Sequence, residues 1–173
     1  MIATILNQVL AFVALVLMQA MVLDHLDLAN GWVVPYLYVF FLLALPFNTP
    51  PWATLLMGFA LGMTMDFFTS TPGMHASACT LMAFVRLLML RLLAPRDGYD
   101  PLKRPIVAHM GMAWYITFAS VLILAHHLWL FFVEVYRFDN FPSTFLRAVM
   151  SAAATLLLCL LAQALTTRAT RLQ

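Results

Sequence analysis

The residue with the clearest capacity for chemistry is Asp66, a carboxylate near the end of the strongly apolar stretch "GFALGMTMDFFTSTPGMHA". It follows Gly58 and Gly62 at intervals of four residues, so all three share one face of a helix. A carboxylate in a membrane-spanning helix indicates a proton relay, a ligand site or a buried ion pair. Because an unpaired charge at mid-membrane costs about 2.5–3.5 kcal/mol on insertion scales, Asp66 needs a partner.

Arg147 is the partner that the sequence predicts for Asp66. The charge of Asp66, in the last turn of its helix, opposes the helix dipole, and so does the charge of Arg147 in the first turns of a later helix. We therefore predict an ion pair between them, with His75 and the hydroxyls of Thr69 and Thr71 as rival partners. An Asp66 that only pins the adjoining turn is favoured over a catalytic or proton-carrying one.

The stretch "FTSTPG" predicts a tight turn on the outer side of the membrane. Pro72 suits the first turn of the following helix, and Ser70 or Thr71 suits its N-cap. The residues of this outer turn are Thr69, Ser70, Thr71, Pro72, Gly73 and His75.

The other polar residues do not suggest an enzyme. His126 and His127, with Glu134 and Asp139, fit no metal-binding spacing, and the sequence holds no motif of hydrolases, zinc proteases or phosphate-binding loops. Arg86 lies about 21 Å along its helix from the outer turn, so we expect it to extend to the inner membrane face. No catalytic, cofactor-binding or metal-binding residue is expected, and no cofactor.

The composition indicates that lipid surrounds the chain. Of its 173 residues 64% are hydrophobic and 9% are charged, and the mean hydropathy is +0.94, whereas soluble domains are about 25% charged. We conclude that it is an integral membrane protein. The net charge of +2 gives no reason to expect nucleic acid as a partner, and Cys79 and Cys159 are expected to be free, buried thiols.

These residues must be positioned by membrane-spanning helices, each of about 20 residues. The sequence predicts one all-α domain, 1–173, with six spans at about 2–23, 32–45, 52–68, 73–94, 106–132 and 144–165. The second span is short and contains Pro35. An aromatic segment near the outer side comprises Trp129, Phe131, Phe132, Tyr136, Phe138 and Phe141. It fits a protruding helix, an amphipathic segment on the membrane surface, or the end of a long tilted helix.

Basic residues predict the orientation of the bundle, because they accumulate in cytoplasmic loops. With six spans, one side holds Arg91, Arg96, Lys103, Arg104, Arg168 and Arg171. The other side holds Arg137, with Arg147 just inside the sixth span. Both termini should therefore be cytoplasmic.

Two helix faces carry small residues that let helices approach closely in lipid. Gly58 and Gly62 form one face, and Ala148 and Ala152 form the other. Either face is a candidate for packing within the bundle or for binding a partner.

The stretch "PPWATLLMGFALGMTMDFFTSTPGMHASACTLMAFVR" resembles the central region of MreD, the bacterial rod shape-determining membrane protein family. The family carries a glycine-rich span that ends in an acid, then a short Pro-Gly turn that opens the next span. The matching positions here are Gly58, Gly62, Asp66, Pro72, Gly73 and His75. The following "RLLAPRDGYDPLKRP" is similar to the branch of the family found in Bacteroidota, and the resemblance covers mainly residues 46–105.

The resemblance implies a non-enzymatic scaffold of the cell-wall elongation machinery in the bacterial inner membrane. Such a protein binds MreC, beside the RodA polymerase, a class-B penicillin-binding transpeptidase and the MreB filament. The implied fold is similar to the six-helix substrate-binding subunits of energy-coupling-factor vitamin transporters. A transporter subunit of that kind, with a small molecule as its ligand, is the alternative function.

Overall fold

The computed structural model describes residues 2–101, 103–135 and 140–171, and every regular element within them is helical. Five of these helices are long and apolar enough to cross a membrane, which agrees with a membrane-embedded all-α protein. They are α1 (Ile2–Met21), α3 (Pro51–Thr69), α4 (Met74–Leu92), α6 (Met112–Val135) and α7 (Phe141–Arg171). The shorter elements are η1 (Leu23–His25), η2 (Leu37–Val39), α2 (Phe40–Leu43) and α5 (Val107–Met110).

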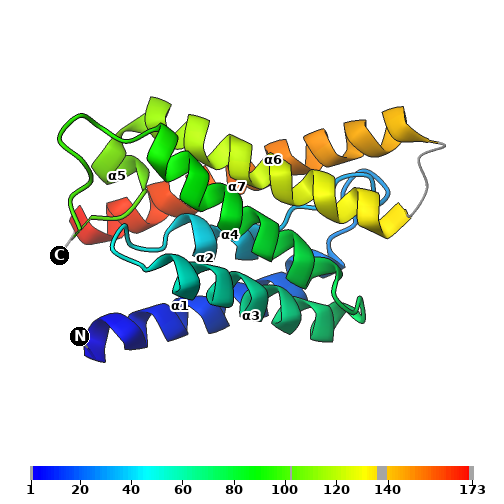
Figure 1. The fold of residues 1–173 in the computed structure, drawn as a ribbon. Helices are drawn as coiled ribbons and strands as arrows, with labels where there is room; N and C mark the ends of the chain where they lie inside the picture. The colour runs from blue at the N-terminus through cyan, green and yellow to red at the C-terminus, as the bar shows by residue number, and fades with distance from the viewer. Residues whose placement is uncertain (1, 102, 136–139, 172–173) are drawn as a thin grey trace.

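The long helices lie side by side in a bundle (Figure 1). Helix α4 packs against α3 and α6, α6 packs against α7, and α1 lies along α3 and the short elements η2 and α2. The beginning of α1 and the end of α7 lie at the same end of the bundle, which also holds the connection between α4 and α6 (Figure 1). The turn between α3 and α4 lies at the opposite end.

The predicted second span is not a membrane-spanning helix. Residues 33–36 form no regular secondary structure, and only η2 and α2 follow them before the chain turns at Pro46. Pro35 lacks a backbone donor and favours an extended conformation in the residue before it, so a helix cannot run through this stretch. Non-helical backbone can advance up to about 3.3 Å per residue against 1.5 Å in an α-helix, so a short segment can run farther along the bundle. We call residues 33–45 the broken segment.

The third and fourth predicted spans match α3 and α4 to within two residues at each end. Pro51 occupies the first turn of α3, where its missing N–H costs nothing. Pro72, however, lies in the turn before α4 and not in its first helical turn. The predicted fifth span is divided at Gly111, whose φ of 83° separates α5 from α6.

The glycine face of α3 is buried against α4. A Cβ at Gly58 would lie 2.9 Å from both the Cβ of Ala83 and the carbonyl oxygen of Cys79, and a Cβ at Gly62 would collide with the backbone of His75 and Ala76. These glycines therefore let two helices of the same chain pack closely, and the face is not open to another protein.

We predict that Gly62→Ala destabilises the protein by about 1–3 kcal/mol, because the added methyl group forces α3 and α4 apart. Titration with sodium dodecyl sulfate in mixed micelles measures the free energy of unfolding. Ala60→Val adds volume to the exposed face of the same helix and should change it little. Equal effects of the two substitutions would contradict the close α3–α4 contact.

Candidate functional site

The backbone of the broken segment is hydrogen-bonded by side chains from other helices. The amides of Val34 and Tyr36 donate to the hydroxyls of Ser151 (3.0 Å) and Thr155 (2.9 Å) on α7. Gln19 of α1 also hydrogen-bonds to this backbone, through both its amide oxygen and its amide nitrogen. Its Oε1 accepts from the amide of Leu37 (2.7 Å), and its Nε2 donates to the carbonyl of Pro35 (3.0 Å) and to Asp24 (2.7 Å). Because non-helical backbone inside a membrane must find partners in the protein, these bonds allow the segment to exist.

The small-residue face of α7 is the surface that receives this segment. Ala148 and Ala152 are buried, and Ser151 and Thr155, which bond to the segment, are 0% exposed. The small side chains let the non-helical backbone come close enough for the two hydrogen bonds. This face therefore serves packing within the chain, like the glycine face of α3.

Thr155 is itself held by His127 of α6. The Nδ1 of His127 lies 2.8 Å from the carbonyl of Ile123, which can only accept, so the ring carries its proton on Nδ1. In the neutral ring Nε2 is then an acceptor, and it lies 3.1 Å from the Thr155 hydroxyl. The hydroxyl donates to His127 and accepts from the amide of Tyr36, so its single proton is committed.

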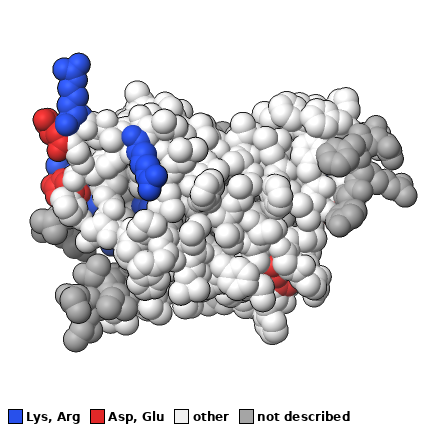
Figure 2. Space-filling model, in the orientation of Figure 1, with Lys and Arg blue, Asp and Glu red and all other residues white. Residues whose placement is uncertain are grey.

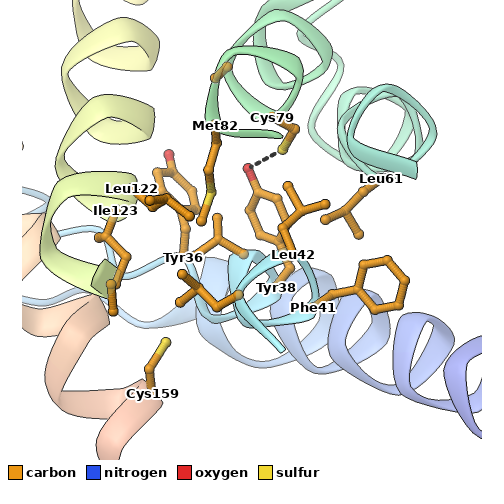
Figure 3. Close-up of a cluster of buried hydrophobic side chains, with 14 of the residues drawn as sticks. Tyr36, Tyr38, Phe41, Leu42, Leu61, Cys79, Met82, Leu122, Ile123 and Cys159 are labelled. Atoms are coloured by element: carbon orange, nitrogen blue, oxygen red, sulfur yellow. Dashed lines mark hydrogen bonds between the residues drawn. The ribbon is translucent and has the colours of Figure 1, made fainter. Parts of the chain in front are cut away.

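A second buried cluster surrounds the hydroxyl of Tyr38. This hydroxyl lies 2.8 Å from Nδ1 of His75 on α4 and 2.8 Å from Nε2 of His126 on α6, and it accepts from the Cys79 thiol at 3.8 Å (Figure 3). It donates its one proton to one imidazole and accepts from the other. Tyr36 packs with its ring against His75, His126 and His127 at centroid distances of 5.4–5.8 Å.

The polar cluster lies within an otherwise apolar core and is sealed from the surroundings. The side chains of Tyr36, Tyr38, Leu42, Met82 and Leu122 fill the space between α4, α6 and α2 (Figure 3). The arrangement can orient hydroxyls and imidazoles, but Tyr38 and His126 are 0% exposed. The cluster therefore has a structural role, which is to hold η2, α4 and α6 together.

Arg86 fastens the other end of the broken segment. The prediction that it extends to the inner membrane face is wrong, because its side chain is 0% exposed. Its Nη2 donates to the carbonyls of Leu45 (2.6 Å) and Pro46 (3.4 Å), which follow the short helix α2 where the chain turns. A charge-assisted hydrogen bond of this kind is about twice as strong as a neutral one.

Asp66 caps the helix that follows it. Its carboxylate accepts from the amides of Gly73 (3.0 Å), His75 (2.8 Å) and Ala76 (3.0 Å) and from the hydroxyl of Thr71 (3.0 Å). The first amides of a helix have no partner within it, and a negative charge at that position also stabilises the helix dipole. The turn is thus pinned by Asp66 itself, and neither Ser70 nor Thr71 is the N-cap, a position that Gly73 occupies.

The predicted ion pair between Asp66 and Arg147 is not formed. Arg147 lies on α7 with its Nη1 3.6 Å from Oε1 of Glu134 on α6, and its guanidinium lies 4.6 Å from the centre of the Phe131 ring. Two charges at a similar depth need not face each other, and the amides of α4 already satisfy Asp66. Of the rival partners, Thr71 contacts the carboxylate through its hydroxyl, Thr69 contacts Thr71, and His75 contributes its amide while its ring turns to Tyr38.

The outer aromatic segment is divided between core and surface. Trp129, Phe131 and Phe132 belong to α6, where Phe131 is buried and the half-exposed Trp129 donates to Ser77 (3.0 Å). The ring of Phe132 packs against that of Phe141 on α7 in a tilted arrangement, with their centres 5.1 Å apart. Tyr136 and Phe138 lie outside the described residues, as do Arg137 and Asp139.

No metal centre is present among the residues that the structure describes, in which no three His, Cys, Asp or Glu side chains converge as ligands. Cys79 and Cys159 are free and buried, as predicted. Sequence reasoning did not identify Gln19, Tyr38 or Arg86 as parts of one site. The available signal was a set of polar residues within long apolar runs, which in a membrane implies buried partners.

Comparisons of the chain with models of protein families, with curated proteins and with solved structures give no match. Its function must therefore be argued from its own residues.

We predict that Asp66→Ala destabilises the protein by about 3 kcal/mol, because three amides, two of them buried, lose their acceptor at about 1 kcal/mol or more each. Asp66→Asn should have a smaller effect, since one carbonyl oxygen remains. In a double-mutant cycle with Arg147→Gln, measured in mixed micelles, the two effects should add. A coupling energy above about 1 kcal/mol, or rescue by exchange of the two charges, would show that the two side chains do form an ion pair.

Thr155→Val removes the hydroxyl while it keeps the shape of the side chain, so the amide of Tyr36 and Nε2 of His127 lose their partner. We expect a loss of about 1–3 kcal/mol and faster amide hydrogen exchange within residues 33–45. Thr117→Val, on the exposed face of α6, removes only a bond to the carbonyl of Ala113 four residues earlier and serves as the control. Unchanged exchange in Thr155→Val would contradict the role given to α7.

Proposed function

We propose that this chain is a non-enzymatic scaffold of the MreD type, which binds MreC in the cell-wall elongation complex and helps to maintain cell shape. The observation that supports this is that the residues carrying the resemblance act as one unit. Gly58 and Gly62 let α3 meet α4, and Asp66 accepts from the amides of Gly73 and His75. A motif whose positions depend on one another in this way is less readily a chance similarity.

We place the protein in the bacterial inner membrane with both termini in the cytoplasm. The two termini lie at one end of the bundle (Figure 1), and on the face shown in Figure 2 the lysine and arginine side chains gather at that same end. This end includes Arg96, Lys103 and Arg104 in the connection between α4 and α6. The preference of basic residues for cytoplasmic loops supports this orientation.

The packing of the outer half of the bundle favours a scaffold over a vitamin-type transporter subunit. A transporter subunit needs a cavity for its ligand on the outer side. Here Tyr36, Tyr38, His75 and His126 fill the interior beneath the outer turn and hydrogen-bond or stack with one another. A ligand would have to displace side chains that hold three helices together.

A partner in the membrane must dock on lipid-facing residues, because the glycine and alanine faces are already occupied. Phe59 and Met63 expose such a surface on α3, and Phe145 and Val149 do so on α7. Trp129 offers a contact nearer the outer end. MreC, with one membrane helix and a periplasmic body, would contact both the lipid-facing residues of α3 or α7 and the outer end of the bundle. RodA, the class-B transpeptidase and MreB would complete the assembly.

Photo-crosslinking in native membranes tests this proposal. A photoreactive amino acid is placed at Phe59, at Val149 or at Trp129, and the products are identified by mass spectrometry. We expect at least one of these probes to capture a single-span protein with a large periplasmic domain. The same amino acid at Cys159, which is 0% exposed, should give no intermolecular product. Capture of a polytopic coupling protein with its ATPases would identify a transporter subunit instead.

A further inference from the structure

A crevice lies between α1 and the broken segment. Its volume is about 100 Å³, and it is partly open to the outside. Ala11 and Leu15 of α1 form one wall, and Phe41 and Ala44 form the other. An engineered apolar cavity of about 150 Å³ binds benzene, so this space accommodates a short stretch of hydrocarbon.

Two polar side chains border the crevice, Arg104 and Gln8. The amide of Arg104 donates to Nδ1 of His109 (3.0 Å), which fixes the backbone of the loop there. Within the part of the chain that the structure describes, however, the half-buried guanidinium makes no hydrogen bond or ion pair. The neighbouring Lys103 pairs with Asp100 at 3.7 Å. A cation next to an apolar crevice therefore has its hydrogen-bonding capacity free.

The crevice adjoins the surface that faces lipid. Leu10 and Val13, on the same helix as Ala11, are 57% and 45% exposed. The Arg104 end of the crevice lies with the basic connection between α4 and α6. In this position a single molecule can reach the apolar walls with a hydrocarbon chain and the guanidinium with an anionic group. Basic pockets between membrane helices on the cytoplasmic side bind lipid headgroups in this way.

We propose that this crevice binds one anionic phospholipid of the surrounding leaflet, whose phosphate contacts Arg104 and whose acyl chain lies between α1 and the broken segment. The bound lipid completes the packing of α1 against residues 40–45. The proposal requires that the chain lies in a membrane, but it does not depend on the scaffold function.

Native mass spectrometry of the full chain in detergent micelles tests the site, with added phosphatidylglycerol or phosphatidylcholine as the probe. The wild type should retain one phosphatidylglycerol in preference to phosphatidylcholine. Arg104→Gln should weaken this retention about fivefold, the contribution of one basic residue at an anionic surface. Ala11→Leu, which fills the crevice, should weaken the binding of phosphatidylglycerol while Arg104 stays in place.

The matched control is Arg96→Gln, which removes the same charge from an exposed position in the same connection and should leave retention unchanged. Thermal unfolding of each variant shows whether it is folded. If Arg104→Gln does not fold, Arg104→Lys replaces it. Because Arg104→Lys keeps the charge, it should retain phosphatidylglycerol in preference to phosphatidylcholine. Equal retention of the two lipids, or equal losses in Arg104→Gln and Arg96→Gln, would overturn the proposal. Displacement of the lipid by millimolar inorganic phosphate would also overturn it, because the site would then be one for a free anion.

Discussion

The structure depends on one constraint, which is that backbone groups inside a membrane must find hydrogen-bond partners within the protein. Residues 33–36 of the broken segment do not form the backbone hydrogen bonds of a helix. Side chains on three different helices bond to the segment instead. Gln19 and the hydroxyls of α7 serve its amides and the Pro35 carbonyl, and Arg86 serves the carbonyls at its far end. Since each of these side chains must reach a fixed atom, the segment determines where α1, α4 and α7 lie.

His75 couples this arrangement to the α3–α4 pair. Its amide donates to Asp66, while its ring bonds to the hydroxyl of Tyr38 in the broken segment. A change in the outer turn therefore acts on both the N-terminus of α4 and the centre of the bundle. The lack of a Cβ at Gly62 brings the backbone of α4 close enough for Asp66 to reach these amides. Gly62, Asp66 and His75 therefore act together in holding α3, α4 and the broken segment in place.

The sequence predicts the helices that have local signals at both ends. Proline at the start of α3 and the Thr-Pro-Gly turn after it bound α3 and α4 to within two residues. It does not predict the course of the broken segment. Pro35 and the short apolar run are visible in the sequence, but the side chains of other helices that bond to the freed backbone are set by tertiary packing. The ion pair of Asp66 with Arg147 was wrong for a related reason. Depth along a helix can be counted from the sequence, but the direction in which a side chain points around the bundle depends on tertiary packing.

The distribution of polar groups also determines how this protein can bind others in the membrane. The hydroxyls of Ser151 and Thr155, the imidazoles of His75, His126 and His127 and the Arg86 guanidinium are buried. The long side chains of Phe59, Phe145 and Leu157 face lipid. Lipid is as apolar as these side chains, so their burial against another helix gains little by itself. Specific association must then come from shape, from polar groups at the two ends, or from lipid held between helices. Helix α1 packs along α3, η2 and α2, and its residues Ala11 and Leu15 line the crevice, so its position is sensitive to what occupies that space.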